Sequence, residues 1–212
     1  MDKQTAPPTA AQRRQRYRQA MVEDILALAR AQMRQDGVAA LSFNAIAREL
    51  GLQPPSLYTY FPSKNAIYNA LFRRGFEVFG GAMEERPDQD GPLRANLTSA
   101  IHTYMRFAQE NPDLYQLMFQ RPVPDFVPSE ESMAVSLVQL EEARQQLAGV
   151  IAQEELAPDL PPAEALDLFI ALQHGLTELH LANDPELPAG EGRFGKLIAA
   201  AVQLILDAWQ PR

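Results

Sequence analysis

The sequence predicts an all-α protein of about nine helices, in which a small N-terminal helical domain precedes a larger C-terminal one. Three observations support this prediction. Apolar residues recur at three- and four-residue spacing along most of the chain. No alternating run of β-branched residues bounded by turn residues indicates a strand. Clusters of proline, glycine and polar residues divide the chain into segments of helical length.

Four helices are expected in the first 83 residues. The first is expected from about Arg16 to Asp36, before a glycine that can close it in the left-handed conformation. Ser42 is expected to cap a short second helix. A proline in the first turn, Pro54 or Pro55, begins a third helix, where its missing N–H costs nothing. Ser63 then caps a fourth helix.

The helical pattern continues beyond the polar segment "EERPDQDGPLR". Proline-rich breaks separate five further expected helices, over residues 92–110, 112–120, 130–155, 162–183 and 191–209. The expected organisation is a flexible basic arm over residues 1–15, a three-helix DNA-binding domain over residues 16–82, and a regulatory and dimerisation domain over residues 83–212.

The net charge of −8 hides two halves of opposite sign. Residues 1–82 contain 11 Lys and Arg against 6 Asp and Glu, whereas residues 83–212 contain 8 against 21. A basic module joined to an acidic body suits binding to a polyanion such as DNA through the first part alone. Chance segregation of solvated charge is the alternative.

The composition and hydropathy of the chain also predict its cellular location. The sequence has no cysteine, which excludes disulfides and thiolate metal sites and suits a reducing compartment. No apolar run reaches the roughly 20 residues that a membrane helix needs. The N-terminus lacks the apolar stretch of a signal peptide. A soluble cytoplasmic protein without membrane contact is expected.

The segment "GLQPPSLYTYFPSK" carries the clearest functional signal. A helix, a tight turn and a short proline-started helix form a helix-turn-helix, whose second helix enters the major groove of DNA. Neutral, flat or hydroxylated outward side chains suit phosphates, base edges and thymine methyl groups. The predicted DNA contacts are Ser42, Gln53, Pro55, Ser56, Tyr58, Thr59, Tyr60 and Lys64.

Two alternatives accompany this prediction. Tyr58 and Tyr60 could be ordinary half-buried aromatic residues with hydrated hydroxyl groups. The basic stretch "RRQRYR" could lie along phosphates or reach a minor groove, or it could be a disordered solubilising tail.

The stretch "ALSFNAIARELGLQPPSLYTYFPSKNAIYNALF" resembles the DNA-binding domain of TetR-family (tetracycline-repressor-like) transcriptional regulators. Tyr60 stands where that family usually has His, and two adjacent prolines replace a helix start that more often has one or none. "LQHGLTEL" resembles a subgroup marked by a Trp-His-Gly triplet, with Gln173 in the Trp position. The resemblance implies a homodimer formed by the last two helices.

The C-terminal helices contain large apolar residues that could surround a ligand cavity. The candidate lining residues are Tyr104, Phe107, Met118, Phe119, Phe126, Met133, Leu137, Phe169, Gln173 and His174. Each apolar candidate could instead be plain core. His174 and Glu178, four residues apart, could be metal ligands or an acid–base pair, but a hydrogen-bonded helix pair is the preferred interpretation.

The sequence shows no nucleophile–base pattern, phosphate loop or HExxH motif, so no enzyme activity, metal or cofactor is expected. The last two expected helices are apolar on more than one side, which favours a dimer through positions such as Ile198 and Leu204. The resulting hypothesis is a homodimeric repressor that binds a near-palindromic double-stranded operator and is released by a small apolar or amphipathic effector. A ligandless DNA-binding protein and an enzyme-like helical module remain alternatives.

Overall fold

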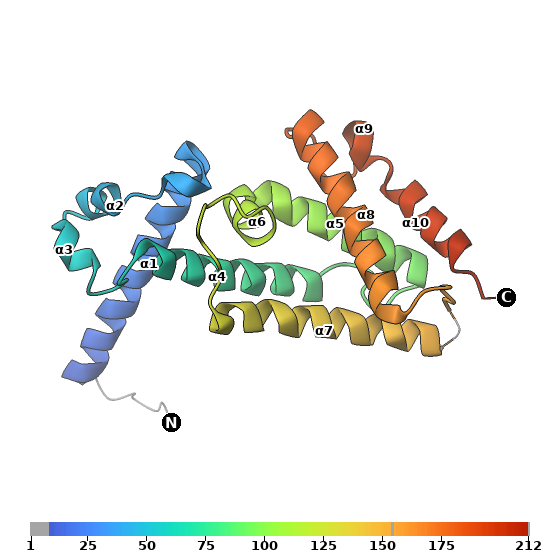
Figure 1. Ribbon diagram of the computed structural model, residues 1–212, viewed down its shortest axis with the longest axis horizontal. Coiled ribbons are helices and arrows are strands. Elements are labelled where there is room, and N and C mark those ends of the chain that lie inside the picture. The colour runs from blue at the N-terminus through green and yellow to red at the C-terminus, as the bar shows by residue number, and fades with distance from the viewer. Residues whose placement is uncertain (1–8, 154, 212) are drawn as a thin grey trace, which may run out of the picture.

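The computed structural model describes residues 9–153 and 155–211, and all the regular structure in these residues is helical (Figure 1). Its helices are α1 Ala10–Asp36, the 3₁₀ turn η1 Val38–Ala40, α2 Phe43–Glu49, α3 Pro54–Leu57, α4 Lys64–Glu84, α5 Leu93–Glu110, α6 Pro112–Phe119, α7 Glu130–Ala152, α8 Pro162–Asn183, α9 Gly192–Gly195 and α10 Ile198–Ala208. The short α9 and α10 together occupy the single helix predicted over residues 191–209. The all-α prediction is confirmed.

Local signals set most helix ends where the sequence predicted them. The Ser42 hydroxyl accepts a hydrogen bond from the Ala45 amide at 3.4 Å, and Ser63 accepts one from the Ala66 amide at 3.2 Å. These bonds satisfy amides that have no partner inside the helix. Pro54 is the first residue of α3.

The first helix begins earlier than predicted. The Thr9 side chain accepts from the Gln12 amide while the Gln12 side chain accepts from the Thr9 amide, which is a capping box. Residues 10–15, assigned to a flexible arm from the sequence, are therefore helical. Residues 1–8 of that predicted arm lie outside the described residues.

One hydrophobic core runs across the predicted domain boundary at residues 82 and 83. It joins Ile25 of α1, Leu57 of α3 and Leu71 of α4 to Phe107 of α5 and Leu114 of α6. Helix α4 runs from the helix-turn-helix end into the centre of the molecule, with α5 and α6 on one side and α7 on the other (Figure 1). A movement of α4 would therefore displace side chains in both predicted domains.

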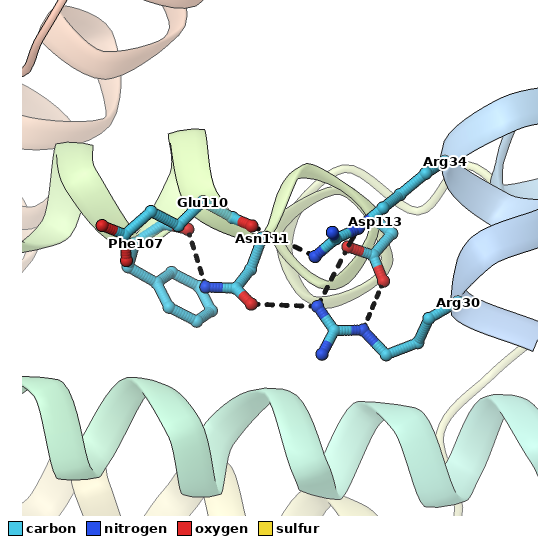
Figure 2. A network of polar contacts seen from close by, with 6 residues as sticks. All are labelled: Arg30, Arg34, Phe107, Glu110, Asn111 and Asp113. Atoms are coloured by element: carbon cyan, nitrogen blue, oxygen red, sulfur yellow. Dashed lines mark hydrogen bonds and ion pairs between the residues drawn. The ribbon is translucent and has the colours of Figure 1, made fainter. Parts of the chain in front are cut away.

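A polar network also ties α1 to α6 (Figure 2). Arg30 Nε lies 2.6 Å from Asp113 Oδ2, and Arg34 Nε lies 2.8 Å from Asp113 Oδ1. Arg30 also donates to the Asn111 side chain at 2.9 Å, and Arg34 donates to the Glu110 carbonyl at 3.1 Å. We call these contacts the α1–α6 network.

Burial by itself would raise the pKa of Asp113, but the hydrogen bonds and charges of Arg30 and Arg34 outweigh it and hold the pKa below its usual value. Asp113 therefore stays ionised, although its side chain is buried.

The C-terminal end of the chain packs on α5 and α8. Ile198 and Val202 of α10 join Ile101 and Met105 of α5 and Leu176 of α8 in a second hydrophobic cluster. Ile198 is only 1% exposed, so the prediction that it faces a partner chain is wrong. Its place is the core of its own domain.

Candidate DNA-binding surface and ligand cavity

The helix-turn-helix is built around a small apolar centre. Ile46 and Ala47 of α2 and Leu57 of α3 are buried. Gly51 has a φ of +66°, which glycine adopts without strain, and the Leu52 amide donates to the Ala47 carbonyl at 2.8 Å across the turn. The angle between α2 and α3 is thereby fixed, and the outer side of α3 is left clear.

Helix α3 is short but its helical turns continue. The Tyr60 and Phe61 amides both donate to the Leu57 carbonyl, at 2.9 and 3.0 Å. Phe61 is buried, as predicted. The backbone from Pro54 to Phe61 therefore forms one rigid support for the side chains that surround it.

The predicted DNA contacts fall into two groups. Gln53, Pro55, Tyr58, Thr59 and Lys64 are exposed, whereas Ser42, Ser56 and Tyr60 are half-buried. Tyr58 is 55% exposed, and its ring packs at a tilt against that of Phe43, with the ring centres 5.0 Å apart, which limits the directions its hydroxyl can point.

Several of these side chains also make contacts inside the protein. Ser42 caps α2, and the Thr59 hydroxyl donates to the Ser56 carbonyl at 2.7 Å. Tyr60 packs against the core under the guanidinium of Arg18, which lies 5.4 Å from the ring centre. Tyr60 therefore fits the half-buried alternative better than Tyr58 does.

The helical start of α1 adds a basic surface beside α3. Arg18 donates to the Thr59 carbonyl at 3.2 Å, and an open groove lies between the two segments. The groove is lined by Ala10, Arg13, Arg14, Tyr17, Arg18, Thr59 and Tyr60. The basic composition of this stretch predicted an arm or a tail, although Thr9 and Gln12 have the spacing of a capping box.

A cavity of about 250 Å³ lies between α4, α5, α6, α7 and α8. Five of the ten predicted lining residues border it, namely Tyr104, Phe119, Phe169, Gln173 and His174. A mixed wall of aromatic and polar groups between helices is the usual form of a small-molecule site.

The other five predicted lining residues do not border this cavity. Phe107 and Met118 are buried in the core, and the Phe126 ring stacks against Tyr68 at 5.3 Å. Met133 and Leu137 are exposed, Leu137 by 56%. Helix α7 turns a different face to the cavity, the one that carries Gln139, Leu140 and Ala143.

The contribution of α4 and the segment after it to the cavity was not predicted from the sequence. Phe76, Phe79 and Met83 of α4 line the cavity at three- and four-residue spacing, together with Arg86 and Gln89. The spacing on α4 was a usable signal for the first three. Nothing in the local sequence indicated that the segment after α4 returns to the cavity.

One wall of the cavity includes Tyr104 and His174, which are backed by further hydrogen-bonding side chains that do not line the cavity. The Tyr104 hydroxyl lies 2.9 Å from His174 Nδ1 and 2.8 Å from His174 Nε2. The Tyr115 hydroxyl donates to Glu178 at 2.8 Å, and Gln120 donates to the same oxygen at 2.7 Å. The predicted His174–Glu178 relation is thus indirect, through Tyr115, whose hydroxyl lies 3.5 Å from His174 Nδ1.

The pKa values in this wall favour neutral side chains. Burial lowers the pKa of His174, and the negative charge of Glu178 only partly opposes this. Burial raises the pKa of the Tyr104 and Tyr115 hydroxyls above their usual value. The cavity is therefore bordered by a neutral imidazole and one phenol, those of His174 and Tyr104, which suits orientation of a ligand by hydrogen bonds.

Comparison with known families decides the class of the protein. Residues 25–71 match the model of the bacterial regulatory proteins of the tetR family, and residues 97–203, half of the chain, match the tetracyclin repressor-like C-terminal domain. The chain belongs to the tetR family. This is a family of DNA-binding transcriptional regulators, as the resemblance of residues 40–72 implied.

Individual relatives show how far the sequence similarity extends. The nucleoid occlusion factor SlmA of Actinobacillus pleuropneumoniae is 24% identical over 84 residues, a match that covers 40% of this chain and 42% of SlmA. The uncharacterized HTH-type transcriptional regulator YobS of Bacillus subtilis is 33% identical over 86 residues, covering 39% and 42%. The chain therefore matches only about two fifths of the length of either relative.

The similarity in fold extends over the whole chain. The structure of a protein with unknown function from Rhodococcus sp. RHA1 has a TM-score of 0.73 at 18% identity, and the match covers 98% of this tetR-family chain and 99% of that one. Membership of the Trp-His-Gly subgroup stays a prediction.

Two further features concern the described residues. No helix among them is long and apolar enough to cross a membrane. They contain no group of three or more His, Cys, Asp or Glu side chains placed to hold a metal ion.

Proposed function

We propose that this tetR-family chain is a transcriptional repressor that binds a near-palindromic operator as a homodimer and leaves it when a small apolar or amphipathic ligand enters the cavity. The observation that carries the proposal is the rigid, outward-facing turn from Gln53 to Thr59 beside a basic groove. The proposal includes a cytoplasmic location, the absence of catalysis, and the division into parts at residues 16–82 and 83–212.

The DNA contacts divide into specific and positioning groups. Gln53 and Tyr58 are exposed on the outer side of α3, where they can reach base edges in a major groove. Lys64 begins α4, so its charge adds to the positive end of that helix at a phosphate. The arginines of the α1 groove add further phosphate contacts. Sequencing the DNA fragments that the purified protein selects would test specific binding directly.

The dimer is proposed to form through α8 and α10. On α8, Leu168, Ala171, Gly175 and Leu179 are exposed at three- and four-residue spacing, and Leu204 of α10 is 68% exposed. A helix in a monomer normally turns such a stripe inward. A second copy that covers it would place two α3 segments in successive major grooves, about 34 Å apart.

Ligand control is proposed because the cavity lies against both α4 and α6. A ligand shifts the protein only if it binds one arrangement more tightly than the other. A tenfold loss of operator affinity needs about 1.4 kcal/mol of coupling, which is within the usual range. A constitutive DNA-binding protein is the alternative, and a screen in which no compound stabilises the protein against heat would favour it.

Substitution of Lys64 tests the phosphate contact. Lys64→Ala should weaken binding to all DNA sequences alike and reduce the slope of log affinity against log salt by about one unit, because one phosphate fewer is neutralised. Fluorescence anisotropy with labelled operator at several salt concentrations measures both effects. An unchanged slope would remove Lys64 from the DNA-binding surface.

Substitution of Phe169 tests the cavity. Its side chain is half-buried, so Phe169→Ala should cost less stability than a fully buried phenylalanine while enlarging the cavity. Operator affinity without ligand should stay within about twofold of wild type, and the concentration of any releasing compound needed for half release should change. Phe169→Ala protein that folds normally and keeps the wild-type response would place the ligand elsewhere.

A further inference from the structure

The cavity is bordered by buried polar atoms that lack a hydrogen-bond partner. Over residues 9–153 and 155–211, six buried side-chain nitrogen or oxygen atoms have none. Three of the six, Arg86 Nε, Gln89 Oε1 and Gln139 Oε1, belong to residues that line this one cavity. Proteins pair almost all such atoms with protein groups or ordered water. Their concentration in the lining of one cavity indicates hydrogen-bonding capacity that the protein does not satisfy, and that a bound molecule would satisfy after a small side-chain rotation, since all three atoms are buried here.

Arg86 offers a donor and a charge. Its two terminal nitrogens are held by the Met83 carbonyl and the Asn96 side chain, neither of which is charged, so that Nε remains. None of the ion pairs among the described residues includes Arg86. Burial lowers the pKa of Arg86, and the charge of Asp90 only partly opposes this. A carboxylate oxygen would supply both the missing acceptor and the missing counter-charge.

Two acidic residues that line the same cavity weaken the preference for a carboxylate ligand but do not cancel it. Glu84 and Glu142 border the cavity, but both are exposed, so water and salt screen their charges. Arg86 is half-buried and acts through a direct hydrogen bond, which screening affects less.

Gln139 offers an acceptor in a fixed orientation. Its Nε2 donates to the Phe76 carbonyl of α4 at 2.6 Å, which leaves Oε1 as the free atom. The close approach depends on Gly80, because a Cβ there would lie 2.5 Å from Gln139 Nε2. A ligand hydroxyl would complete this site by donating to Oε1.

The two sites lie at opposite ends of the α4 wall. Gln139 is bound to Phe76, and Arg86 is bound to Met83, seven residues further along the helix. At 1.5 Å per residue the separation along α4 is about 10 Å. The aromatic rings of Phe79, Phe119 and Phe169 line the cavity with them.

We infer that the cavity takes a small, elongated aromatic hydroxy acid, with its carboxylate at Arg86 and its hydroxyl donating to Gln139. This rests on the ligand control proposed above and adds the chemical class of the ligand. The cavity volume of about 250 Å³ suits a single-ring compound rather than a large one.

Three related probes test the inference on the wild-type protein by isothermal titration calorimetry. The probe 4-hydroxycinnamate carries both polar ends, cinnamate lacks the hydroxyl group, and 4-hydroxycinnamamide lacks the charge. We expect 4-hydroxycinnamate to bind at least about tenfold more tightly than either of the others, because cinnamate loses the hydrogen bond to Gln139 and 4-hydroxycinnamamide loses the negative charge that pairs with Arg86. Equal affinities, or no binding of any probe at millimolar concentration, would overturn the inference.

Variants assign each end of the ligand. Arg86→Met should abolish the difference between the acid and the amide, and Gln139→Leu should abolish the difference between 4-hydroxycinnamate and cinnamate. Arg144→Met is the matched control, because Arg144 Nε is also buried without a partner but does not line the cavity. If Arg86→Met does not fold, the probe comparison on wild type and the Gln139→Leu variant still decide the inference.

Failure of the inference and failure of the proposed function give different results. If 4-hydroxycinnamate binds as expected but does not release the operator, the ligand class stands and ligand-controlled release is wrong. If compounds without these two polar ends release the operator, and Arg86→Met and Gln139→Leu respond to them as wild type does, release stands and the ligand class is wrong.

Discussion

Replacing Leu204 by glutamate is expected to dissociate the dimer and to lower operator affinity by at least about 100-fold, a loss of about 2.7 kcal/mol. Leu204 is 68% exposed on α10, so the variant monomer should fold normally. In the proposed dimer the same change would bury two carboxylates at the interface without partners, which is strongly unfavourable. Sedimentation velocity at micromolar concentration and anisotropy with labelled operator measure the two effects.

The matched control is Leu137→Glu, the same substitution at an exposed leucine on α7. It should leave both the assembly and the operator affinity unchanged. If Leu137→Glu dissociates the dimer and Leu204→Glu does not, the interface lies on α7 instead of α8 and α10. Wild type that sediments as a monomer would contradict the dimer altogether.

The dimer prediction also shows how much residue spacing alone can decide. Ile198 and Leu204 are six residues apart, so at 3.6 residues per turn their side chains lie on clearly different sides of one helix. Both could not be central to one interface. The structure buries Ile198 against α5 and α8 and exposes Leu204.

Short-range signals predicted the helix-turn-helix well because its geometry depends on adjacent residues. The caps at Ser42 and Ser63, the proline start at Pro54 and the positive φ of Gly51 are each decided within four residues of chain. The missed start of α1 was equally local, since Thr9 and Gln12 form its capping box. Residues 10–15 were expected to be flexible because of their basic composition, which does not by itself prevent a helix.

The cavity could be predicted only in part because its lining depends on contacts distant in sequence. Residue type pointed to Phe169 and His174, which line the cavity. It could not say which face of α7 turns inward, so Met133 and Leu137, which are exposed, were named with them. Arg86 and Gln89 lie in a segment whose polar composition resembles an ordinary turn. Their place at the cavity follows from the path of the chain between α4 and α5.

The α1–α6 network leads to the second large effect. Asp113→Asn is expected to lower the free energy of unfolding by about 2–4 kcal/mol, because it leaves Arg30 and Arg34 facing each other without a counter-charge. The estimate lies below that for a fully buried pair, since the Arg30 and Arg34 side chains are 25% and 45% exposed. Urea denaturation at neutral pH, followed by circular dichroism, measures the change.

The pH dependence of stability separates the charge of Asp113 from its size. Because the pKa of Asp113 is depressed in the folded protein, its charge contributes its full stabilisation above the ordinary carboxyl pKa of about 4. That contribution is lost as the pH falls from there through the depressed pKa, because the unfolded chain takes up the proton first. The difference in stability between wild type and Asp113→Asn should therefore shrink in acid.

The control is Asp24→Asn, which removes a carboxylate from an exposed position on α1. It should change stability by less than about 0.5 kcal/mol and leave the pH profile of wild type intact. A difference between wild type and Asp113→Asn that stays constant down to acid pH would show that the charge of Asp113 does not hold α1 and α6 together. The expected result would instead make α6 a link between the two ends of the molecule in addition to α4, because the same eight-residue helix binds α1 through Asp113 and borders the cavity through Phe119.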